Sequence, residues 1–160
     1  MSVAQEKKLF ISPPINGWVL VMGPHLPDPG EDVDQCFRFL VDLSRKLGQV
    51  QFFSANRVVN HHAWVQVHQG VVQRAYAWTG RTVWNQGRKT NVETELGMKC
   101  FGYTELPEPS RFAQADPLQH NTERVFLLAA RWSVDPTTVD ARRLRESRGL
   151  AGDISRSKAH

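Results

Sequence analysis

The stretch from His61 to Trp84 constrains the fold most strongly, because it alternates in hydrophobicity and is interrupted twice by turn residues. Val65-Gln66-Val67-His68 alternates apolar and polar side chains, which predicts a half-buried β-strand. Gln69-Gly70 and Thr79-Gly80 are tight-turn sequences, and each is followed by another run typical of a strand. The stretch therefore predicts an antiparallel meander, which begins upstream with a strand at Val50-Gln51-Phe52-Phe53.

A two-residue turn at Gln69-Gly70 fixes which residues face one another across the first hairpin. It places Val67 opposite Val72, Val65 opposite Arg74 and Ala63 opposite Tyr76. The face predicted to be buried carries Ala63, Val65, Val67, Val72, Tyr76 and Trp78. The opposite face carries His62, Trp64, Gln66, His68 and Gln73.

Three segments have helical signals. Between Glu31 and Leu47 the apolar residues recur at helical spacing, with acidic residues at the start, basic residues at the end and Gly48 following. Thr90-Asn91-Val92-Glu93 fits a capping box that opens a short helix ending at Gly97. The apolar residues of 122–132 form one face of a further helix.

The remaining segments complete the predicted architecture. Trp18 to Met22 is an apolar run typical of a central strand, and the prolines of residues 101–120 predict a long surface loop. Together these elements predict an α+β fold with an antiparallel sheet at about 50–84, packed by helices at about 31–47 and 122–132. The length of 160 residues suits a single domain over residues 1–150, followed by a disordered polar tail at 151–160.

Composition excludes several classes of protein. The chain has two cysteines and no apolar run of about 18 residues, so it predicts neither a disulfide framework nor a membrane span. Its first residues lack the pattern of a signal peptide, because Pro13-Pro14 interrupts a short apolar stretch. We expect a soluble, cytoplasmic protein that does not contact a membrane.

No catalytic, metal or cofactor site is predicted. His61 and His62 point to opposite faces of a strand, and His62 and His68 lie about 20 Å apart on one face. Cys36 lies in mid-helix, where its pKa is not lowered. The sequence contains neither a nucleophile elbow nor a glycine-rich phosphate loop. An enzymatic role is therefore the less favoured alternative.

Arg74 stands out because the predicted register places its charge among apolar side chains. A buried guanidinium needs partners for its five N–H donors. One interpretation is structural: an ion pair with Glu93 or Glu95, or an arginine that reaches solvent at the sheet edge. The other is a guanidinium that faces a ligand carboxylate or phosphate, as in a small-ligand enzyme.

The polar face of the hairpin suggests a surface for a protein partner. Trp64 lies there between histidines, and tryptophan is enriched among residues that dominate protein interfaces. We predict partner binding by Trp64, His62, His68 and Arg81. The alternative is that Trp64 packs beneath a helix.

The C-terminal segment is basic, with six basic and three acidic side chains between Val139 and His160. Residues 127–144 resemble the helix-turn-helix segments of bacterial transcription regulators, with a small residue at Ala129 and an apolar turn anchor at Val134. The resemblance implies DNA contacts by Thr137, Thr138, Arg142 and Arg143. A helix stopped by a proline turn is the structural alternative.

The runs at 53–64, 73–80 and 84–87 resemble small uncharacterised bacterial α+β proteins, some of which are immunity proteins of toxin systems. This resemblance implies a non-enzymatic protein-binding protein that neutralises a cognate toxin. DNA binding through residues 127–144 is the alternative function.

Overall fold

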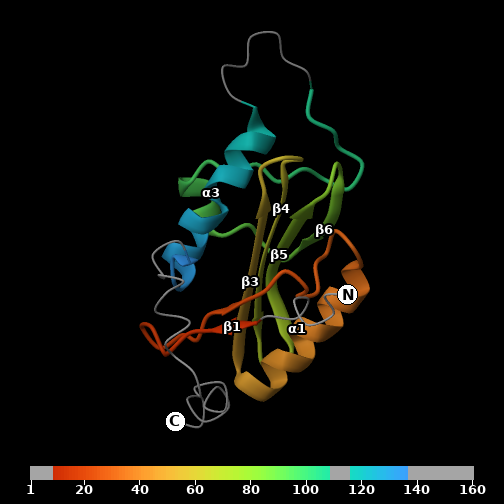
Figure 1. Cartoon of the computed structure of the whole chain (residues 1–160). Coiled ribbons are helices and arrows are strands. Elements are labelled where there is room, and N and C mark those ends of the chain that lie inside the picture. Colours follow the sequence, from red (N-terminus) through yellow and green to blue (C-terminus); the bar gives the residue numbers. More distant parts are fainter. Residues whose placement is uncertain (1–8, 109–115, 137–160) are drawn as a thin grey trace, which may run out of the picture.

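The computed structural model describes residues 9–108 and 116–136. Its centre is an antiparallel sheet with the strand order β3-β4-β5-β6, and helices cover both faces of this sheet (Figure 1). The strands are β3 (Gln49–Asn56), β4 (His61–His68), β5 (Val71–Trp78) and β6 (Thr82–Gln86). The helices are α1 (Val33–Leu47), α2 (Asn91–Glu95) and α3 (Pro117–Trp132). The predicted α+β fold and meander are confirmed.

Helix α1 ends at Leu47 with Gly48 following, as predicted, and begins at Val33 rather than at Glu31. The Asp32 carboxylate accepts a hydrogen bond from the Gln35 N–H (3.0 Å), and the Gly48 N–H donates to the Ser44 carbonyl (2.7 Å). The helix packs Cys36, Leu40 and Val41 against one face of the sheet. Helix α2 has the predicted capping box between Thr90 and Glu93.

The first hairpin turns at Gln69-Gly70 as predicted, and both residues have positive φ (46° and 82°), as a type I′ turn requires. Val67 pairs with Val72, which is also as predicted. Beyond this pair the predicted register was wrong, because a β-bulge at Gln73 inserts one extra residue into β5. Val65 therefore pairs with Ala75 and Ala63 with Ala77.

The bulge moves the aromatic residues of β5 to the other face. The α1 face of the sheet is built from small aliphatic side chains, including Ala63, Val65, Val67, Ala75 and Ala77. Tyr76 and Trp78, predicted to lie with them, instead join Trp64 beneath α3. Both faces are therefore buried, one against α1 and one against α3 with the residues around α2.

Two predicted boundaries were also wrong. Helix α3 begins at Pro117 rather than Thr122, because Asp116 caps it and proline is well suited to the first helical position. Phe101, expected in a surface loop, is 2% exposed and packs into the core under α3. Its backbone N–H donates to the Tyr76 hydroxyl (3.0 Å).

The apolar run from Trp18 to Met22 does not form a central strand. Only β2 (Val21–Met22) is a strand, and it pairs with β1 (Phe10–Ile11) in a separate two-stranded ribbon. Trp18 instead bridges to Ile15 across a tight turn at Asn16-Gly17, which reverses the chain. Both residues of β2 are exposed.

Candidate functional site

The structure does not bring the four predicted partner-binding residues together. Trp64 and His62 are 0% and 2% exposed, because α3 covers the face on which they lie. A partner cannot reach them without displacing α3, so their assignment to an interface was wrong. His68 and Arg81 are exposed, but His68 adjoins the Gln69-Gly70 turn and Arg81 lies at the opposite end of the sheet.

Arg74 lies on the α3 face and forms a buried ion pair with Glu93. The Arg74 Nε–H lies 2.9 and 3.0 Å from the two carboxylate oxygens, and its terminal NH2 group lies 2.9 Å from Glu93 Oε1. Glu93 also accepts hydrogen bonds from the Trp64 indole N–H (2.7 Å) and the Thr90 backbone N–H (2.7 Å). One carboxylate thus joins β4, β5 and the start of α2.

The rest of the Arg74 guanidinium is also occupied. Its NH1 group donates to the Asn85 side-chain oxygen (2.8 Å) and lies within 3.3 Å of three backbone carbonyls. Its NH2 group contacts Cys100 Sγ at 3.1 Å. All N–H donors of the Arg74 guanidinium therefore face groups of the same chain. Arg74 has a structural role, and no donor is left to bind a ligand carboxylate or phosphate.

Neither cysteine is activated. Burial raises the pKa of the Cys100 thiol to about 11, although the Arg74 charge acts in the opposite direction. Burial also raises the pKa of Cys36 to about 12. Both thiols are therefore protonated at neutral pH, whereas a nucleophilic cysteine needs a thiolate.

His62 is held as a neutral ring. Its Nδ1 lies 2.9 Å from Thr122 Oγ1, which donates its own proton to the Leu118 carbonyl, so Nδ1 carries the hydrogen. Nε2 then accepts from the Asn121 amide at 3.4 Å. Burial lowers the pKa of His62 to about 4. This network ties β4 to α3.

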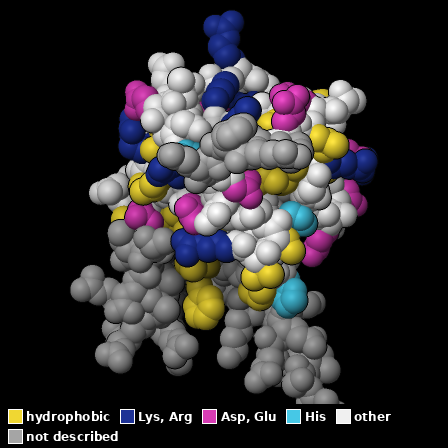
Figure 2. Space-filling model, turned by 90° about the horizontal axis from the view of Figure 1, so that it is seen from above, with side chains coloured by type: hydrophobic (Ala, Val, Ile, Leu, Met, Phe, Trp, Pro, Cys, Tyr) yellow, Lys and Arg dark blue, Asp and Glu magenta, His cyan; other side chains and the backbone are white. Residues whose placement is uncertain are grey.

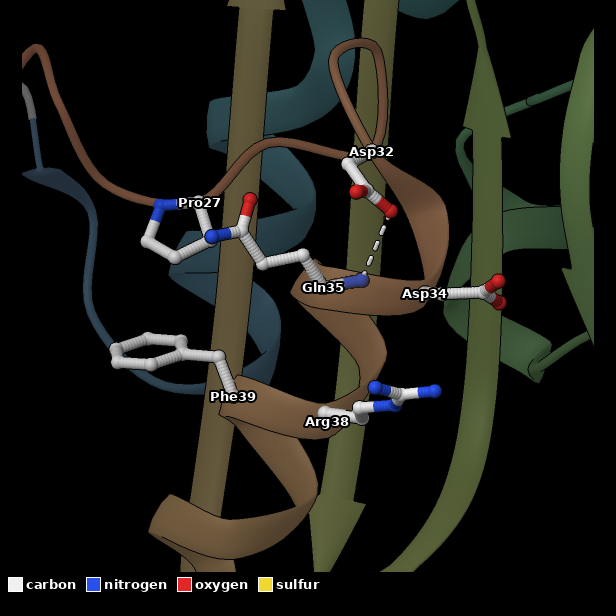
Figure 3. A pocket seen from close by; sticks show the side chains of 6 residues that line it. All are labelled: Pro27, Asp32, Asp34, Gln35, Arg38 and Phe39. Carbon is white, nitrogen blue, oxygen red and sulfur yellow. Dashed lines mark hydrogen bonds between the residues drawn. The ribbon is translucent and has the colours of Figure 1, made fainter.

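No group of three or more potential metal ligands occurs among residues 9–108 and 116–136. A surface hollow of about 680 Å³ lies at the start of α1, lined by Pro27, Asp32, Asp34, Gln35, Arg38 and Phe39. Figure 3 shows that Asp34 and Phe39 point away from each other, while Asp32 is engaged in capping the helix. The hollow thus lacks a convergent set of catalytic groups.

The end of the sheet at the β3–β4 turn offers a different kind of surface. The turn exposes 92% of Val58 and 52% of Val59. Asn56 fixes the turn, because its side-chain oxygen accepts from the Val58 N–H (3.0 Å). The β5–β6 turn lies at the same end of the sheet and exposes Arg81.

We call Arg57, Val58, Val59 and Arg81 the tip surface. Figure 2 looks down on this end of the molecule and shows basic, acidic and apolar side chains interspersed rather than a face of one charge. Neither arginine forms an ion pair with another described residue. The sequence signal for this surface is the apolar pair Val58-Val59 inside a turn, where polar residues are usual.

No protein-family profile, curated protein or solved structure matches this chain. In the part of the chain that the structure describes, no helix combines the length and the apolar character needed to cross a membrane. Thr137, Thr138, Arg142 and Arg143, the predicted DNA-contacting residues, lie outside the described residues, as do the domain boundary at 150 and the tail at 151–160.

Proposed function

We propose that this chain is a non-enzymatic protein-binding protein that contacts its partner through the tip surface. The observation that carries the proposal is the 92% exposure of Val58 at the end of a hairpin between two eight-residue strands. Burying an exposed valine is favourable by roughly 1.5–3 kcal/mol. Valine also has few rotamers, so little side-chain entropy is lost on binding.

The chemistry of the tip surface specifies the partner. An apolar pocket would accept Val58 and Val59, and carboxylates at the rim of that pocket would pair with Arg57 and Arg81. An immunity-type role, in which the partner is a cognate toxin, is the form of this proposal that the resemblance to bacterial α+β proteins supports.

The test is an affinity capture from source lysate, with and without nuclease, read by mass spectrometry. The variants are Val58→Asp and, as a matched control, Val71→Asp, because Val71 is 60% exposed at the other end of the sheet. We expect one stoichiometric protein to be captured by the wild type and by Val71→Asp and lost with Val58→Asp. Equal capture by both variants would remove the tip surface as the contact.

DNA binding through residues 127–144 is the second candidate. The observation in its favour is that α3 ends at Trp132 and is followed by the buried Val134, as the helix-turn-helix resemblance implies. If nuclease abolishes the capture of every protein, and the retained DNA is lost when Arg142 and Arg143 become alanine, this function replaces the first.

A further inference from the structure

Strand β3 forms one edge of the sheet, and its own residues lack the features that usually protect an edge strand. It pairs with β4 in an unbroken register from Gln49 to Asn56. Within the described part of the chain, the backbone from Val50 to Asn56 makes no hydrogen bond on its other side. The eight residues include no charged side chain and no proline. Natural edge strands usually carry a charge, a proline or a bulge that prevents pairing with another chain.

The opposite edge, strand β6, is protected in several ways. It has five residues, and a bulge at Val83 interrupts its register with β5. The Tyr103 hydroxyl accepts from the Asn85 N–H (2.9 Å) and donates to the Asn85 carbonyl (3.2 Å), so it occupies both backbone groups there. The two edges of one sheet therefore differ, and β3 alone is long, regular and uncharged.

We propose that β3 pairs with β3 of a second copy of this chain, so that the two sheets join across a two-fold axis. Such an axis makes the two strands antiparallel, and it requires one surface to be complementary to itself. Strand β3 meets this requirement, because its lack of charge brings no like charges opposite one another.

The side chains of β3 also suit this pairing. An axis at Phe52 places Phe52 opposite its own copy on the α1 face, with Val50 opposite the copy of Ser54. On the other face, Gln51 lies opposite the copy of Phe53. Phe52 and Phe53 are half-buried in the single chain, and pairing would cover more of both rings. This proposal is independent of the tip surface.

The experiment measures the solution mass by light scattering over a range of concentrations, together with hydrogen exchange of the amides of residues 49–56. Two variants are compared: Gln51→Lys places a charge on the edge strand, and Gln66→Lys places one on the inner strand directly opposite. Both glutamines are half-buried and lie on the same face of the sheet, so Gln66→Lys is a matched control for Gln51→Lys.

We expect a dimer whose population rises with protein concentration. The protection of the β3 amides from hydrogen exchange should rise with the dimer population. Gln51→Lys should weaken the dimer at least tenfold, while Gln66→Lys and the tip variant Val58→Asp should retain it. A monomer at every concentration, or protection of β3 that does not vary with concentration, would overturn the proposal. The wild-type exchange data decide the question even if a lysine variant fails to fold.

Discussion

Arg74 and Glu93 show how one buried charge is made compatible with a protein core. Glu93 is 0% exposed and accepts hydrogen bonds from Arg74, Trp64 and Thr90. The sequence allowed either Glu93 or Glu95 as the partner of Arg74. The capping box decides between them, because it turns the Glu93 carboxylate back toward the sheet, whereas Glu95 pairs with Arg131 at the surface.

Glu93→Gln should therefore destabilise the fold strongly, because it leaves the Arg74 cation buried without its anion. We expect the free energy of unfolding in urea to fall by about 3–5 kcal/mol. Glu95→Gln is the matched control on the same helix, and its exposed ion pair should contribute less than about 1 kcal/mol. Similar losses for the two variants would contradict the structural role of Glu93.

His62 should make the fold sensitive to mild acid. Its pKa is about 4 in the folded chain and 6.5 ordinarily, so the unfolded state binds the proton more readily. The contribution of neutral His62 to the free energy of unfolding is fully present above pH 6.5. It falls by about 3 kcal/mol as the pH decreases to 4. Protonated Nε2 would also face the Asn121 amide donor.

Urea unfolding between pH 7 and pH 4 checks this expectation. The wild type and the exposed-site control His68→Gln should lose about 3 kcal/mol more than His62→Gln over this range. Glu93 affects stability only at lower pH. Burial opposes its ionisation, but hydrogen bonds from Arg74 and Thr90 bring its pKa below 4.5. Its contribution is lost only as the pH falls below that value. Equal pH dependence of the wild type, His68→Gln and His62→Gln would exclude His62 as the cause.

At the scale of elements, three short-range signals in the sequence correspond to the structure. The caps of α1, the capping box of α2 and the Gln69-Gly70 turn each depend on a few neighbouring residues. The bulge at Gln73 has no such signal within β5; the Gln73 backbone packs closely against Gly87, which follows β6 and is distant in the sequence. The extra residue Gln73 decides which face of the sheet Arg74 and Tyr76 occupy. Without it, the alternation of the sequence assigns these two side chains to the wrong face.

Gly87→Ala should disrupt this bulge. A Cβ atom at Gly87 would lie 2.2 Å from the Gln73 carbonyl oxygen, and the residue has a φ of +80°. Gly80→Ala is the matched control, because Gly80 has a φ of +89° but no atom within 4 Å of the added Cβ. We expect the control to lose about 1–2 kcal/mol of stability from the backbone conformation alone. Gly87→Ala should lose clearly more, and equal losses would show that the contact can relax.

At the scale of the whole molecule, two helices enclose one sheet, and the sequence predicted both helices but not that they cover opposite faces (Figure 1). The alternation of apolar and polar residues assigned mostly polar side chains to the face of the hairpin that carries His62 and Trp64. This pattern indicated an exposed face. The polar groups on that side are instead paired with one another and with α2 and α3. Long-range pairing of this kind is not visible in the pattern of a single strand.

The stability of the molecule should therefore be uneven. Residues 62–65 of β4 and 74–78 of β5 are buried at the centre of the sheet, so their amides should exchange with deuterium only through global unfolding. The β1–β2 ribbon has two-residue strands, and β2 is exposed, so its amides should exchange by local opening. Native-state hydrogen exchange in low urea checks this, and equally slow exchange at Val21 and Val65 would contradict it.

The enclosure of both sheet faces has a consequence for how chains of this kind can diverge. A substitution on either face must suit a helix as well as the neighbouring strands, so the interior tolerates little change. Val58 and Val59, in contrast, are largely exposed to solvent. A lineage built on this architecture could therefore acquire new binding specificities by exchanging one short turn while inheriting its interior unchanged.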